Sequence, residues 1–72
     1  MNNENNQERL NKLKEEAANQ YVAETKNEKP SIGKSDVTMT NGTEIVILRD
    51  KQEKIVAHYQ LLKEYKFHRL DK

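Results

Sequence analysis

The spacing of the hydrophobic residues changes near residue 36. Over residues 7–28 the apolar side chains recur every three or four positions, at Leu10, Leu13, Ala17 and Tyr21. This spacing places them on one face of a helix, whose other faces carry Glu, Lys, Asn and Gln. We therefore predict an amphipathic but largely polar helix over residues 7–28. Residues 1–6, which hold only Asn and Glu after the first methionine, are predicted to be a disordered tail.

A segment rich in turn-forming residues follows the predicted helix. Residues 29–35 combine Pro30 and Gly33 with polar side chains. Proline disfavours helical geometry in the residue before it, so the helix should end by this point. We predict that residues 29–35 are a linker between two parts of one domain.

Beyond the linker the hydrophobic period becomes two. Val37 and Met39 alternate with threonines, Asn41 and Gly42 follow, and residues 43–48 form a second run rich in β-branched side chains. Asn-Gly readily adopts the positive φ angles of a two-residue type I′ turn. The sequence therefore predicts a β-hairpin here.

The last third of the chain is compatible with two structures. Asp50 followed by Glu53 fits the capping box that opens a helix. The apolar residues after it, however, fall mostly on odd-numbered positions, and on a helical wheel they scatter around the circumference. Period two is favoured, with a third strand over residues 54–62 and a fourth over residues 64–70. Strand alternation would then place together, on the buried side, Ile55, Tyr59 and Phe67.

These elements predict an α+β fold, in which an N-terminal polar helix precedes a small antiparallel β-meander of three or four strands. Most of the apolar residues lie in residues 36–72, which we expect to be the β-rich folding unit of a single domain. The alternative architecture is a helix, a β-hairpin and a C-terminal helix.

Composition limits the core that such a fold can build. Of 72 residues, 33% are hydrophobic and 35% are charged, and there is no cysteine to form a disulfide. Self-association would remove more apolar surface from water, so we expect a homodimer. No secretory leader and no long apolar run is evident, so we expect a cytoplasmic protein that does not enter a membrane.

Catalytic and metal-binding patterns are not evident in the sequence. Possible nucleophiles and carboxylate pairs are scattered, and a chain this short offers little concave surface for a reaction. His58 and His68 would share the solvent face of the predicted strands, but no cysteine or nearby carboxylate pair completes a metal-ligand set. We expect no enzymatic activity, no cofactor and no metal site.

Recognition of a protein is the function that this composition favours. We expect a small non-enzymatic regulatory or inhibitory protein that docks onto a larger protein partner, through a sheet edge or through the N-terminal helix. A short, cysteine-free chain rich in Asn and Lys would suit a phage or plasmid accessory factor acting on host machinery. The residues predicted to bind the partner are Leu10, Leu13, Ala17, Tyr21, Val37 and Met39.

Nucleic-acid binding is the alternative function. Near the C-terminus, basic residues are interleaved with Tyr65 and Phe67, a combination that binds phosphates and stacks on bases. Strand alternation works against it, because the rings would face opposite to Lys66 and His68. The residues predicted for this alternative are Lys63, Lys66, His68, Arg69, Lys51 and Lys54.

Overall fold

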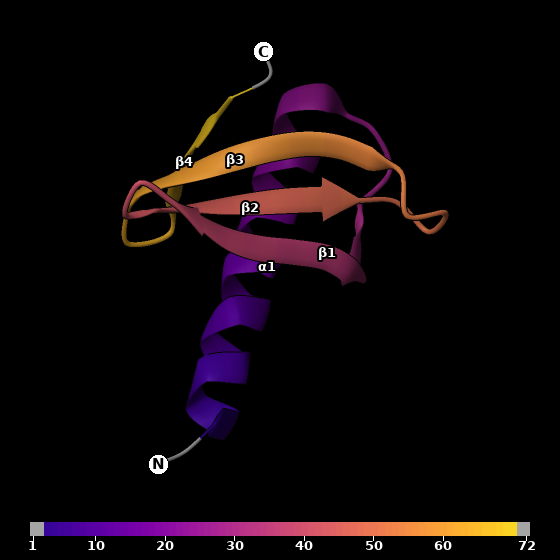
Figure 1. Cartoon of the computed structure of the whole chain (residues 1–72). Helices are drawn as coiled ribbons and strands as arrows, with labels where there is room; N and C mark the ends of the chain where they lie inside the picture. The colour runs from indigo at the N-terminus through magenta and orange to yellow at the C-terminus, as the bar shows by residue number, and fades with distance from the viewer. Residues whose placement is uncertain (1–2, 71–72) are drawn as a thin grey trace.

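The structure, a computed structural model, describes residues 3–70 and the side chains of residues 7–70. One helix precedes four antiparallel strands, which lie in the sheet in the order β1-β2-β3-β4 (Figure 1). This confirms the α+β fold of a helix followed by a β-meander, and the alternative with a C-terminal helix is wrong. The elements are α1 (Asn3–Thr25), β1 (Ser31–Thr40), β2 (Thr43–Arg49), β3 (Ile55–Lys63) and β4 (Lys66–Arg69).

Helix α1 begins and ends earlier than the predicted residues 7–28. It starts at Asn3, inside the segment predicted to be a tail, while residues 1 and 2 lie outside the described residues. It ends at Thr25 because Lys26 adopts a left-handed conformation, with φ of 62°. The Lys26 N–H still donates to the Val22 carbonyl at 2.8 Å, which closes the last turn.

Most of the predicted linker belongs to strand β1. The strand begins at Ser31, but its register against β2 shifts between Ser31 and Asp36, so this part is irregular. Ser35 lies in the shift and is 2% exposed. Its hydroxyl donates to the Ser31 carbonyl at 2.7 Å and accepts the Arg49 N–H at 3.0 Å. The Ser35 hydroxyl therefore takes the place of a backbone–backbone hydrogen bond that the bulge removes.

The Asn-Gly turn joins β1 to β2 as predicted. Asn41 and Gly42 have φ angles of 52° and 78°, and Thr40 pairs with Thr43 across the turn. Two successive positive φ angles define the type I′ turn, whose twist matches that of the flanking strands. This turn fixes the register of the regular part of β1.

Asp50 closes a hairpin loop between β2 and β3 instead of opening a helix. Its carboxylate oxygen Oδ1 accepts the N–H groups of Gln52 and Lys54 at 2.9 and 3.0 Å, and its carbonyl accepts the Glu53 N–H at 2.9 Å. A short acidic side chain captures backbone N–H groups equally well at a helix start and in a turn. This shared chemistry explains why the sequence fitted both structures.

The last two strands differ slightly from their predicted bounds. Strand β3 occupies Ile55–Lys63, against the predicted 54–62, and β4 is confined to Lys66–Arg69. It is shorter than the predicted 64–70 because Glu64 and Tyr65 form the turn that precedes it.

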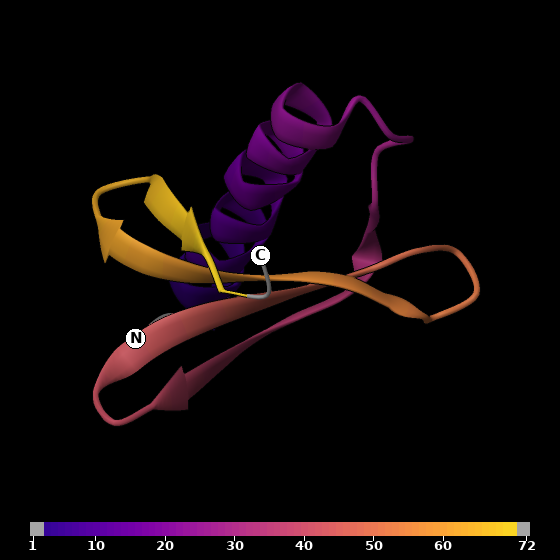
Figure 2. The ribbon, with the colours of Figure 1, turned by 90° about the horizontal axis from the view of Figure 1, so that it is seen from above.

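The core lies between α1 and one face of the sheet (Figure 2). Tyr59 and Phe67 meet there edge to face, with ring centroids 6.4 Å apart. Ile55, predicted to join them, is instead 45% exposed, because the register of β3 shifts where Ile55 pairs with Arg49. The buried apolar residues are Leu13, Ala17, Ala18, Tyr21, Val46, Leu48, Ala57, Tyr59 and Phe67.

Candidate functional site

The described sheet has two edges, and they differ. Strand β4 forms one edge, and the Nε2 group of Gln20 on α1 donates to the outward carbonyl of Phe67 at 3.0 Å. The strand is also only four residues long. The β4 edge therefore offers little backbone for a further strand to pair with.

The first half of β1, at the other edge, is also protected. Pro30 precedes the strand and carries no N–H, and the bulge around Ser35 breaks the regular ladder. The ammonium group of Lys14 on α1 donates to the Ser35 carbonyl at 3.3 Å. A neighbouring strand would find few regular hydrogen-bonding groups along this part.

The second half of β1, residues 36–40, is regular, and we call it the open edge. In a two-residue hairpin the residues that flank the turn form a hydrogen-bonded pair, and bonded and non-bonded pairs then alternate. Since Thr40 pairs with Thr43, the N–H and C=O groups of Val37 and Met39 point away from β2. Within the described part of the chain, no strand and no side chain bonds to them.

Bonds elsewhere in the sheet agree with this alternation. Continued across β2 and β3, the alternation points the backbone N–H and C=O groups of His58 toward β4. It points those of Phe67 away from β3. The Leu70 N–H does donate to the His58 carbonyl at 2.9 Å, and the Phe67 carbonyl does point outward to Gln20. The orientation of Val37 and Met39 thus follows from one consistent ladder.

The side chains of the open edge are mainly apolar or hydroxylic. On the helix side, Val37 packs against the core, whereas Met39 is 62% exposed. The one charged residue, Asp36, lies 3.2 Å from the guanidinium of Arg49. Charged side chains are a common means of preventing strand addition, and residues 37–40 contain none.

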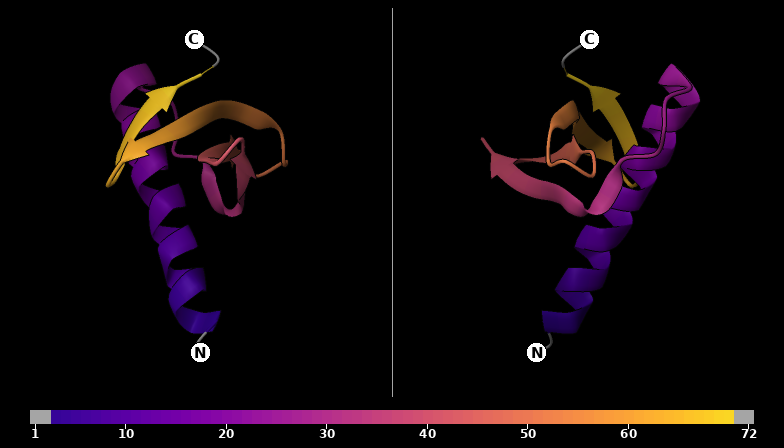
Figure 3. Two further views of the ribbon diagram at one scale, coloured as in Figure 1. Left: turned by 60° about the vertical axis from the view of Figure 1, so that its left-hand side comes forward. Right: turned by 90° about the vertical axis from the view of Figure 1, so that its right-hand side faces the viewer.

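The N-terminal turns of α1 extend past the open edge. The helix crosses behind the sheet and continues beyond β1, as the views in Figure 1 and Figure 3 both show. A strand added beside β1 would therefore lie over these turns.

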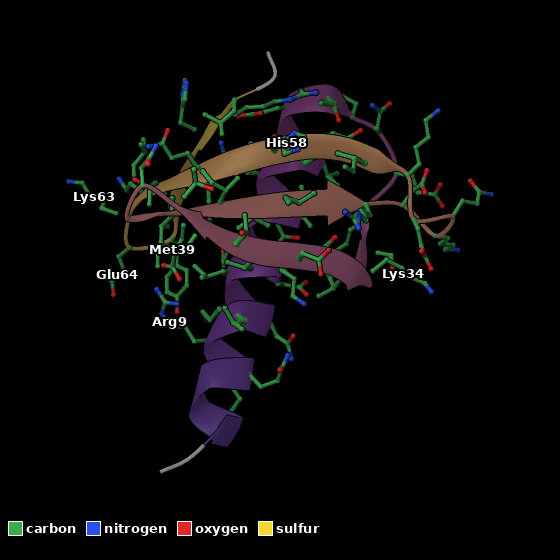
Figure 4. The ribbon with its side chains drawn as sticks, in the orientation of Figure 1. Arg9, Lys34, Met39, His58, Lys63 and Glu64 are labelled. Carbon is green, nitrogen blue, oxygen red and sulfur yellow. The ribbon has the colours of Figure 1, made fainter. Side chains whose placement is uncertain are left out.

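Arg9 fixes this part of α1 to the sheet. Its guanidinium donates two parallel hydrogen bonds to the Glu44 carboxylate, at 2.7 and 2.5 Å. Glu44 is the register partner of Met39, and Figure 4 places Arg9 and Met39 at the same end of the molecule. The hydrogen bonds from Arg9 lower the pKa of Glu44, and the carboxylate raises the pKa of Arg9. The pair is thus ionised and holds the helix beside the edge.

The residues predicted to bind a protein separate into two groups. Leu13, Ala17 and Tyr21 are buried between α1 and the sheet, and Leu10 packs partly against the same core. The helical stripe is therefore occupied within the chain. Only the predicted residues of β1, Val37 and Met39, lie at an accessible edge.

The residues predicted to bind nucleic acid do not gather on one surface. Lys51 and Lys54 belong to the β2–β3 loop, whereas Lys63 and Lys66 flank the β3–β4 turn at the opposite end of the sheet (Figure 1). His68 lies on the outer face, paired with Gln60. Arg69 lies on the helix side, and its guanidinium carbon is 5.6 Å from the centroid of the Tyr21 ring.

Sequence reasoning did not find the role of Gln20. Its amide caps a carbonyl 47 positions further along the chain, and no local signal links the two residues. Only the crossing of α1 over β4 brings them together.

The described residues form neither a metal centre nor a membrane-spanning helix. Among the described residues, no group of three or more His, Asp or Glu side chains could hold a metal ion. In that part of the chain, no helix is both long and apolar enough to cross a membrane. Comparison with protein-family models, curated proteins and solved structures finds no match to this chain.

Proposed function

We propose that this chain is a small non-enzymatic regulatory or inhibitory protein of the cytoplasm, which docks onto a larger protein by pairing the open edge with a strand of that partner. The observation that carries the proposal is the outward orientation of the Val37 and Met39 backbone groups. Of the two docking modes that the sequence suggested, we keep the sheet edge, because the apolar stripe of α1 is already buried. An accessory role for a phage or plasmid remains part of the proposal.

The outward backbone N–H and C=O groups of the open edge are suited to strand addition. Main-chain hydrogen bonds would supply most of the affinity, and they need no special side chains. On the helix side, an added strand would cover the exposed part of Met39 and continue the apolar surface that begins at Val37. We therefore expect a partner segment that is extended and carries an apolar residue at every second position.

Selection from a library of displayed random peptides tests this proposal without a known partner. Peptides selected on the full chain should alternate apolar and polar residues. In an NMR titration with one selected peptide, the largest amide shifts should fall on Val37 and Met39. Met39→Pro should abolish binding, because it removes an outward N–H that the fold of the chain does not use.

Met39→Ala is the matched control, since it removes the same exposed side chain and keeps the N–H. It should retain measurable binding, weakened by roughly tenfold or less. If Met39→Pro binds the peptides as well as Met39→Ala does, or if the shifts fall on another surface, docking through the open edge is refuted. Circular dichroism verifies that both variants fold.

A further inference from the structure

The open edge is complementary to itself, and we propose that it pairs with the open edge of a second copy of this chain. Pairing two β1 strands antiparallel about a two-fold axis at Thr38 places Val37 of each copy opposite Met39 of the other. These are the two residues whose N–H and C=O groups point outward. Both therefore form hydrogen-bonded pairs across the axis.

The side chains agree with this register. On the helix side, Met39 of each copy lies beside Val37 of the other, so the most exposed large apolar side chain of the described residues is covered. On the outer face, Thr38 meets Thr38 and Asp36 meets Thr40, so no like charges oppose each other. Moving the axis to Asp36 would bring two carboxylates together, and moving it to Met39 would pair Val37 with the turn residue Asn41. The register centred on Thr38 uses only the regular part of the strand.

The size of the interface sets the strength of the pair. Five paired residues bury less than the roughly 1,000 Å² that a stable interface needs. The N-terminal turns of α1 extend past β1 in each copy (Figure 3), and the two helices would lie on the same face of the paired sheets. We expect a dissociation constant of roughly micromolar order or weaker.

Self-pairing would regulate docking, and this part of the inference rests on the proposed function. The second copy and the strand of a larger protein would occupy the same backbone groups of Val37 and Met39. Dimerisation would therefore mask the docking edge, and a partner would have to displace the second copy. Selected peptides that bind the open edge should convert dimer to monomer in sedimentation experiments.

Cysteine variants test the register directly, because the natural chain has no cysteine. In the proposed dimer the two Thr38 residues form a non-hydrogen-bonded pair with Cα atoms about 4.5 Å apart, which suits a disulfide. Thr38→Cys should form a covalent dimer under mild oxidation. Thr40→Cys is the matched control on the same face of β1, and its two copies would lie about 13 Å apart, too far to bridge.

Sedimentation velocity of the full chain supplies the second measurement. The wild type and Met39→Ala should dimerise as concentration rises, while Met39→Pro should weaken the dimer by about tenfold or more. Equal cross-linking of both cysteine variants, or a wild type that remains monomeric at millimolar concentration, would overturn self-pairing. Peptide binding by a monomeric chain would remove this inference and leave docking standing, whereas dimerisation without peptide binding would do the reverse.

Discussion

Two polar side chains stabilise the irregular segments of this fold. Ser35 bridges the bulge of β1, and Asp50 collects the N–H groups of the β2–β3 loop. Both satisfy backbone groups that regular pairing leaves open. Ser35 is buried, so leaving its partners unsatisfied would be destabilising by about 1–3 kcal/mol, a large share of the net stability of a domain this small. The N–H groups of the loop are exposed and can bond to water, so the bonds from Asp50 contribute less.

The Arg9–Glu44 pair should make stability depend on pH. The pKa of Glu44 is lowered in the folded chain, so its contribution is present above the pKa of an unfolded glutamate, about 4.3, and is lost as pH falls through the folded value. Glu44→Gln should destabilise the fold by about 1 kcal/mol at neutral pH, since Arg9 is half exposed. Thermal unfolding at several pH values measures this difference, which should narrow below about pH 4.

Glu53→Gln is the control for this prediction. Glu53 pairs with Lys34, but its side chain is 67% exposed, so the substitution should change stability very little at any pH. A loss in Glu44→Gln that stays constant down to acidic pH would show that the charge of Glu44 is not what holds α1.

At the scale of elements, α1 ends in a residue with an unfavourable backbone conformation, which a substitution can relieve. Lys26 occupies the left-handed position that follows many helices, where glycine is preferred because it has no Cβ. Lys26→Gly should stabilise the chain by about 0.5–1 kcal/mol, and Lys26→Ala, which keeps the Cβ, should not. Thermal denaturation should show the glycine variant melting roughly 2–8 °C higher. An equal or greater gain for alanine would mean that the charge of Lys26, and not its backbone conformation, is unfavourable.

The elements predicted well are those with a local cause. Asn41-Gly42 determines its own turn, and alternation in β3 is visible over several residues without knowledge of the helix. The assignment of residues 29–35 as a linker missed the start of β1, because Ser35 stabilises that segment through Arg49, a residue far along the chain. The exposure of Ile55 likewise depends on a register shift between two strands, which no periodicity of one strand reveals.

The candidate site was only partly predictable, for a related reason. The first strand of a meander is unpaired on one side, so the predicted hairpin is enough to put Val37 and Met39 at a sheet edge. The apolar stripe of α1 was equally suited to a partner and to the core. Whether the helix packs on its own sheet is decided by how well the stripe fits the apolar side chains of the strands, and that fit has no local sequence signature.

At the scale of the molecule, the basic residues predicted to bind nucleic acid do not share one surface of the described part of the chain. The net charge is +1, and the lysines of the nucleic-acid alternative lie at both ends of the sheet. Several phosphates need several cations on one face, and binding of that kind weakens steeply with salt. We predict no mobility shift of single- or double-stranded oligonucleotides even at about 50 mM salt. A complex that forms there and dissociates at about 200 mM would contradict this and restore the alternative.

Gln20 also limits the number of copies that the proposed self-pairing can join. A molecule that joins its copies side by side grows into a ribbon only if it has two adhesive sides, as in amyloid. Here the β4 edge is only four residues long and the Gln20 amide on α1 occupies one of its outward carbonyls, so in the proposed dimer growth would stop at the pair. The same contact that packs the helix would thus protect a chain with a bare strand from forming fibres.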